Sequence, residues 1–140
     1  MSHTDSRSVL LHQIYSEQNS QFDRFVLGAT LAACAYLAQT NPFGKIALNI
    51  ESLYLLSLLT LVAAAYKGFR RIETCITAIQ TNGVMLGHLE MQRNWDADAL
   101  RGSLEIWRDK SSSAYRWRNR LLLLSFILYI LTKVVEAYVR

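Results

Sequence analysis

The sequence has little charge, one proline and two cysteines among its 140 residues. Hydrophobic residues make up 51% of the chain and charged residues 19%, an apolar excess that a small water-soluble domain would struggle to bury. This composition excludes an intrinsically disordered chain. No charged residue lies between Arg24 and Lys45. The same holds between Glu51 and Lys67, so the sequence predicts a membrane protein in which apolar spans alternate with polar segments.

Few residues are suited to metal binding or catalysis. Cys34 lies in an apolar stretch and Cys75 on a polar helix beyond the predicted interface, so no disulfide is expected between them. The three histidines are scattered, and none has a second ligand at metal-binding spacing, so we expect no metal and no cofactor. We find no Ser/His/Asp set and no glycine-rich phosphate loop, which makes an enzyme the least expected class.

Three apolar segments predict membrane spans. The first, residues 25–40, is rich in alanine and ends in a turn at residues 41–45. The second, residues 46–66, is roughly 31 Å long as a helix, which matches a hydrocarbon core of about 30 Å. The third covers residues 121–139, and charge interrupts its second half. Small residues four apart in the first span predict close helix packing, namely Gly28 with Ala32 and Ala29 with Ala33.

Polar segments flank the spans. Residues 8–22 have apolar side chains at helical spacing, which predicts an amphipathic helix that either packs on the bundle or docks on a membrane or partner. Residues 67–120 predict a helical hairpin with a turn and an N-cap at residues 94–96. One face of its first helix carries Ile72, Ile76 and Ile79, followed by Gly83 and Leu86.

Basic residues indicate the orientation of the spans. Arg70 and Arg71 follow the second span and three arginines precede the third, whereas the 41–45 turn contains only Lys45. The positive-inside rule therefore places the N-terminus and residues 67–120 in the cytoplasm and the C-terminus outside.

The predicted fold class is all-α, an integral membrane helical bundle with three transmembrane helices. The predicted segments are a cytoplasmic amphipathic helix (1–24), a transmembrane helical hairpin (25–66), a cytoplasmic helical insert that forms a hairpin (67–120) and a third transmembrane helix (121–140).

The third span carries a polar stripe at positions i, i+4, i+7 and i+11, which are Ser125, Tyr129, Thr132 and Glu136. Charged groups within a membrane cost roughly 2.5–3.5 kcal/mol each and usually face a bundle interior or a water-filled path, so copies of this span are expected to surround a pore. The alternative is that Lys133 extends to the interface, Glu136 pairs with it, and Ser125 and Thr132 bond to the helix backbone. For Ser57 and Thr60 the alternative is core or interhelical hydrogen bonding. The pore-lining candidates are Ser57, Thr60, Ser125, Tyr129, Thr132, Lys133 and Glu136.

Aromatic and basic residues alternate over residues 107–120. Such a mixture can bind phosphates while stacking bases, which predicts a nucleotide or single-stranded nucleic acid as ligand. The alternative is an ordinary membrane interface, in which arginine and aromatic side chains meet anionic lipids. The binding candidates are Arg108, Lys110, Arg116, Trp117, Arg118 and Arg120.

This order of segments resembles small membrane effectors of bacterial antiphage systems, the class that includes SLATT-type effectors and the Hailong channel effector. The resemblance covers the whole chain and lies in size, span order and charge layout. It implies a homo-oligomer that permeabilises the inner membrane when a nucleotide or nucleic-acid signal, or its removal, acts on the cytoplasmic part. A third span departs from the two-span SLATT-type pattern.

The predicted function is accordingly an oligomeric channel of the bacterial inner membrane. The first span packs subunits, the other two line the conduit, and residues 108–120 receive the gating ligand. The alternative is a non-conducting membrane adaptor whose insert recruits a cytosolic partner protein. The expected partners are the lipid bilayer, further copies of the chain, and a nucleotide or single-stranded nucleic acid.

Overall fold

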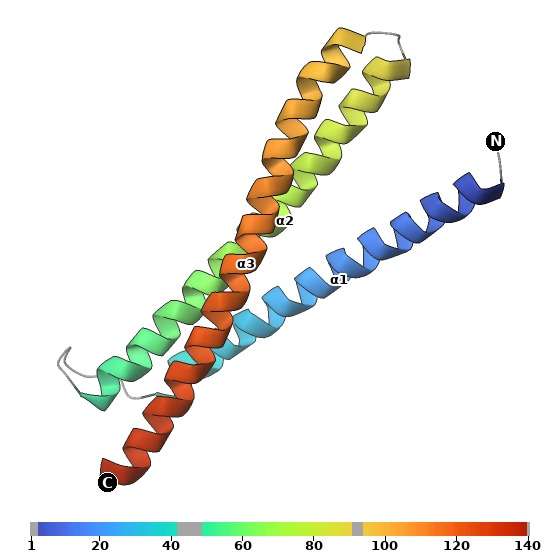
Figure 1. Cartoon of the computed structure of the whole chain (residues 1–140). Helices are drawn as coiled ribbons and strands as arrows, with labels where there is room; N and C mark the ends of the chain where they lie inside the picture. Colours follow the sequence, from blue (N-terminus) through green and yellow to red (C-terminus); the bar gives the residue numbers. More distant parts are fainter. Residues whose placement is uncertain (1–2, 42–48, 91–93, 140) are drawn as a thin grey trace.

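The computed structural model consists of three long α-helices (Figure 1). Helix α1 covers His3–Thr40, α2 covers Ile50–Glu90 and α3 covers Asn94–Val139. The structure describes residues 3–41, 49–90 and 94–139, and within them it confirms the predicted all-α class.

Each helix joins segments that the sequence analysis treated separately. Helix α1 contains both the predicted amphipathic helix and the first apolar segment, and α2 and α3 each join an apolar segment to one arm of the predicted hairpin. Helices stay continuous because the only proline, Pro42, lies outside all three of them. Helix α3 begins at Asn94, where a turn and N-cap are predicted; the side chains of residues 94–99 lie outside the described part of the chain.

Helices α2 and α3 pack side by side in an antiparallel pair along their length (Figure 1). Helix α1 packs on α2 with its C-terminal half, and its N-terminal half diverges from the pair to form a V (Figure 1). Ile14 and Phe22 are 44% and 53% exposed, so the N-terminal half is not packed on the bundle at these positions. Leu10, Leu11 and Tyr15 of the predicted apolar face lie outside the described side chains.

The contact between α2 and α3 follows a seven-residue repeat, which keeps one side of each helix turned toward its partner. Most side chains at this seam are small or polar, so the two backbones can approach closely. Gly68 lies at this seam, where an added Cβ would be 3.4 Å from the side chains of Arg118 on α3 and Leu27 on α1. The repeat runs through Leu104, Ser111, Arg118, Ser125 and Thr132 on α3, and through Tyr54, Ser57, Leu61, Ala64, Gly68, Arg71 and Cys75 on α2.

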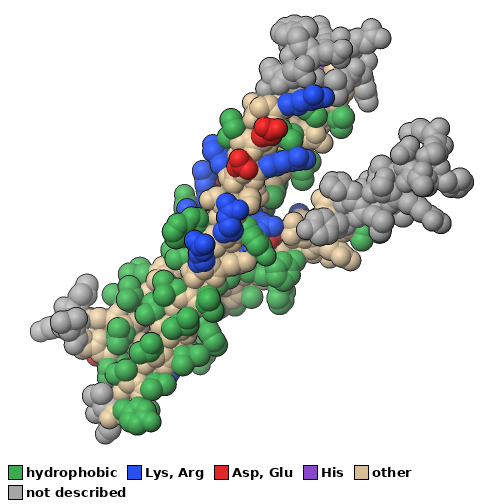
Figure 2. All heavy atoms as spheres, in the orientation of Figure 1, with side chains coloured by type: hydrophobic (Ala, Val, Ile, Leu, Met, Phe, Trp, Pro, Cys, Tyr) green, Lys and Arg blue, Asp and Glu red, His purple; other side chains and the backbone are tan. Residues whose placement is uncertain are grey.

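Two of the helices, α2 and α3, are long and apolar enough to cross a membrane; α1 does not meet this criterion over its described residues. Only 33% and 11% of the apolar windows of α2 and α3 are buried, so most of their hydrophobic surface faces outward. Figure 2 shows hydrophobic side chains covering one half of the molecule and charged side chains gathered on the other. The structure therefore supports membrane association through an apolar half, while the number of passes and their orientation stay predictions.

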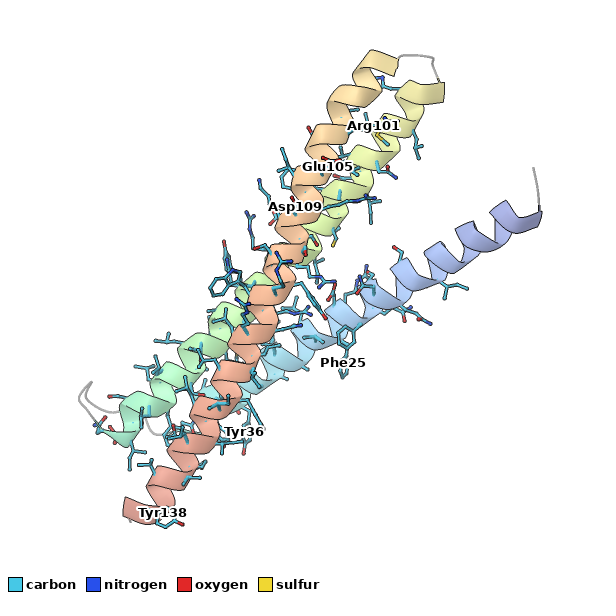
Figure 3. The ribbon with its side chains drawn as sticks, viewed as in Figure 1. Phe25, Tyr36, Arg101, Glu105, Asp109 and Tyr138 are labelled. Carbon is cyan, nitrogen blue, oxygen red and sulfur yellow. The ribbon has the colours of Figure 1, made fainter. Side chains whose placement is uncertain are left out.

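Labelled side chains illustrate the two halves (Figure 3). Phe25 and Tyr36 on α1 and Tyr138 on α3 are 72%, 60% and 88% exposed in the apolar half. Three ionisable residues, Arg101, Glu105 and Asp109, lie along the polar half of α3. The predicted isoleucine face is not the surface by which α2 contacts α3, because Ile76 and Ile79 are 50% and 67% exposed.

Candidate functional site

All three helices meet at a buried ionic cluster, which we define as Asp23 of α1, Arg71 of α2 and Arg118 of α3. Arg118 Nη1 donates a hydrogen bond to Asp23 Oδ1 at 2.8 Å, and Arg71 Nε lies 2.7 Å from Asp23 Oδ2. Arg71 Nε and Asp23 Oδ2 are close enough to form an ion pair, but their geometry is not that of a hydrogen bond. The three side chains are only 2–9% exposed, so a single carboxylate joins two arginines away from water.

Other side chains surround the guanidinium groups of the ionic cluster. The Tyr115 ring centroid lies 4.1 Å from Arg71 Cζ and 5.0 Å from Arg118 Cζ, so both cations contact its π face. Asn19 Oδ1 accepts a hydrogen bond from Arg71 at 3.3 Å, and Asn119 Oδ1 accepts one from Arg118 at 3.2 Å. These contacts compensate in part for burying two positive charges against one negative charge.

A groove of about 660 Å³ lies beside the ionic cluster, between α1 and the α2–α3 pair. We call it the V-groove, and its lining comes from all three helices. Its charged residues are three arginines, Arg24, Arg71 and Arg108, and one acid, Asp23. Hydroxyl groups and the isoleucine face of α2 complete the lining, so the V-groove combines a cationic region with an apolar wall.

The pore-lining candidates lie at the α2–α3 seam of a single chain. Ser125 Oγ donates to the backbone oxygen of Ser57 at 3.0 Å, and Ser57 Oγ donates to that of Ser125 at 3.4 Å. Thr60 and Thr132 donate to backbone oxygens of their own helices. Ser57, Ser125 and Thr132 are at most 3% exposed, so in this conformation they are not accessible to a water-filled path.

The remaining pore-lining candidates cluster at the end of the seam formed by the start of α2 and the end of α3. Tyr54 donates a hydrogen bond to Glu136 at 2.5 Å, and its ring lies 6.2 Å from that of Tyr129. Lys133 Nζ lies 3.1 Å from Glu136 Oε2 and 5.0 Å from the Tyr54 ring centroid. The Lys133–Glu136 pair and the Thr132 backbone bond are both features of the alternative interpretation of the stripe; pore lining stays a prediction.

The predicted ligand-binding residues do not form one site. Arg118 is buried in the ionic cluster, and Arg108 lines the V-groove. The others occupy exposed or half-exposed positions and contact side chains of their own helix. Lys110 lies over the Trp107 ring at 4.7 Å, Arg120 over the Trp117 ring at 5.9 Å, and Arg116 donates to Ser112 at 2.9 Å.

The ionic cluster is not predicted from the sequence, in which Arg71 indicates the orientation of the spans, Arg118 is a ligand-binding candidate and Asp23 belongs to the cytoplasmic segment 1–24. The position of Arg118 at the α2–α3 seam could have been predicted from the seven-residue repeat, because Arg118 lies seven residues before Ser125 and on the same helix face. No comparable signal marks Asp23, whose burial depends on where α1 crosses the pair.

Among the described residues, no group of three or more His, Cys, Asp or Glu side chains is arranged to hold a metal ion. Comparison with known proteins finds no matching family model, no matching curated protein and no matching solved structure.

Proposed function

We propose that the chain is the subunit of an oligomeric membrane channel or pore-forming effector. The observation that carries this proposal is Lys133, whose side chain is 50% exposed in the apolar half of α3. Its neighbour Val134 is also exposed, as expected of a surface in contact with lipid. The Lys133 ammonium group stays half exposed although it pairs with Glu136, and such a group is costly in hydrocarbon, whereas a water-filled path between subunits would solvate it.

An outward-facing surface of α1 supports oligomerisation. Gly28, Ala29, Ala32 and Ala33 are exposed, and a Cβ added at Gly28 would meet nothing within 4 Å. Small residues four apart are typical of helices that pack closely within a membrane. Because neither α2 nor α3 covers this surface, we assign it to a neighbouring copy of the chain.

The continuous helices provide a route for gating. Helices α2 and α3 each run from the polar half to the apolar half, so a movement of the polar half displaces the seam and Lys133. The conduit is proposed to run between subunits past Lys133, with the seam hydroxyl groups becoming accessible when the pair separates. As an effector in antiphage defence, the channel would open or close when a nucleotide or nucleic acid binds its two states with different affinity.

Ion flux through reconstituted vesicles tests the proposal. The purified chain in liposomes is expected to conduct, and Lys133→Glu is expected to shift the reversal potential in a salt gradient toward cation selectivity. Val134→Ala, one residue away on the exposed surface, is the control and should leave selectivity unchanged. Vesicles that remain sealed with the assembled protein present would contradict a channel, as would a reversal potential that Lys133→Glu does not alter.

A second candidate is the membrane adaptor, which exposed apolar residues in the polar half favour. Ile79 and Ile106 are 67% and 55% exposed there, with Ile76, Val84 and Leu86 also at least half exposed. Such residues can contact a cytosolic partner protein. Sealed vesicles, together with partner binding that is lost in Ile79→Asp, would favour the adaptor.

A further inference from the structure

The V-groove has the charge of an anion-binding site. Three of its lining residues are arginines and one is an acid, and that acid, Asp23, already contacts Arg71 and the buried Arg118. The carboxylate is therefore neutralised within the ionic cluster, and the V-groove keeps a positive charge. Its volume of about 660 Å³ is within the range of small-molecule sites.

Two of these arginines are available to a ligand. Neither Arg24 of α1 nor Arg108 of α3 forms a hydrogen bond or ion pair with a described residue. The Ser111 hydroxyl also lines the V-groove but lies 3.1 Å from Cys75 Sγ in the α2–α3 seam, and Ser112 accepts a hydrogen bond from Arg116. Guanidinium groups from two helices that line one groove favour a phosphate group, whose oxygens accept several bonds at once.

The apolar wall restricts the ligand further. Ile72, Ile76 and Ile79 lie along the α2 side of the V-groove, and the last two are half exposed or more. A bare inorganic ion would leave this wall in water. A molecule that joins a phosphate to an apolar or aromatic body would cover it and gain the corresponding hydrophobic free energy.

We infer that the V-groove binds a phosphate-bearing molecule with an apolar or aromatic body, with the phosphate held by Arg24 and Arg108. This phosphate chemistry is shared by a soluble nucleotide and a phospholipid headgroup. The inference rests on the proposed function only in naming the ligand that acts on the channel.

Binding to the full chain tests this inference with two probes. ATP is titrated calorimetrically into the protein in phosphatidylcholine nanodiscs, and retention of phosphatidylglycerol is measured by native mass spectrometry. Arg108→Gln is expected to weaken binding of at least one probe about tenfold, the loss of a bond to a charged group. Arg101→Gln removes the same charge from the same helix, outside the lining, and is expected to change affinity less than threefold. Circular dichroism confirms that both variants fold.

The outcomes identify the source of the phosphate. Arg108-dependent binding of ATP supports a soluble ligand, and Arg108-dependent retention of phosphatidylglycerol supports a lipid headgroup. Equal weakening by Arg108→Gln and Arg101→Gln would overturn the inference, because it would indicate general attraction to positive charge. Failure of both probes to bind would overturn it too. Binding without vesicle conductance refutes the channel alone, and conductance without binding refutes the V-groove ligand alone.

Discussion

The α2–α3 seam contains two polar regions that differ in the way their polar groups are satisfied. In the apolar half, Ser57 and Ser125 bond to each other's backbone across two helices. In the ionic cluster, Asp23 of a third helix joins Arg71 to Arg118. Neutral hydroxyl groups can turn to nearby carbonyl groups, whereas two buried cations require an anion from elsewhere. The ionic cluster therefore links α1 to both other helices, whereas the hydroxyl pair links only α2 to α3.

Removing the shared carboxylate should have the largest effect. Asp23→Ala leaves Arg71 and Arg118 buried together without a counter-charge, and we expect a loss of about 3–5 kcal/mol in stability together with detachment of α1. Chemical denaturation in detergent measures the stability, and limited proteolysis of α1 reports the detachment. Asp109→Ala, at an exposed position on α3, is the matched control. Equal behaviour of the two variants would show that the ionic cluster does not hold α1.

Substitutions at Gly68 and Gly28 distinguish helix packing within one chain from helix packing between copies of the chain. Gly68→Leu places a side chain against Arg118 and Leu27, and overpacking there should cost about 1–3 kcal/mol. A Cβ added at Gly28 meets nothing within 4 Å, so we expect Gly28→Leu to give a smaller oligomer without lowering monomer stability. Denaturation and light scattering of the detergent-solubilised protein measure the two effects. An oligomer that withstands Gly28→Leu would remove the role proposed for this face of α1.

The smallest effect is expected at the hydroxyl pair. Ser125→Ala removes the donor to the Ser57 carbonyl oxygen and should cost about 0.6 kcal/mol, as is typical of interhelical bonds in membranes. The double variant with Ser57→Ala should show little coupling, because each hydroxyl donates to backbone rather than to the other hydroxyl. If Ser125→Ala lost as much unfolding free energy as Asp23→Ala, the hydroxyl pair would be as important to stability as the ionic cluster, contrary to this prediction.

Helical class and the positions of the apolar stretches could be predicted from residue periodicity. The polar stripe through Ser125 and Thr132 was also visible in the sequence, since residues seven apart share one face. The sequence did not predict which element covers that face, because the same polar stripe is compatible with pore lining and with packing against an antiparallel helix. The V-groove could not be predicted, since it depends on the angle at which α1 leaves the pair.

The sequence by itself determined that the chain forms long helices with an apolar and a charged half, because composition and spacing act within one helix. Only the tertiary structure decided that Arg118 is buried while Arg116 and Arg120 are exposed. It also decided that Asp23, 95 residues away from Arg118, supplies the counter-charge. A charge is stabilised by whatever lies within a few ångströms of it, and for these residues that neighbour belongs to another helix.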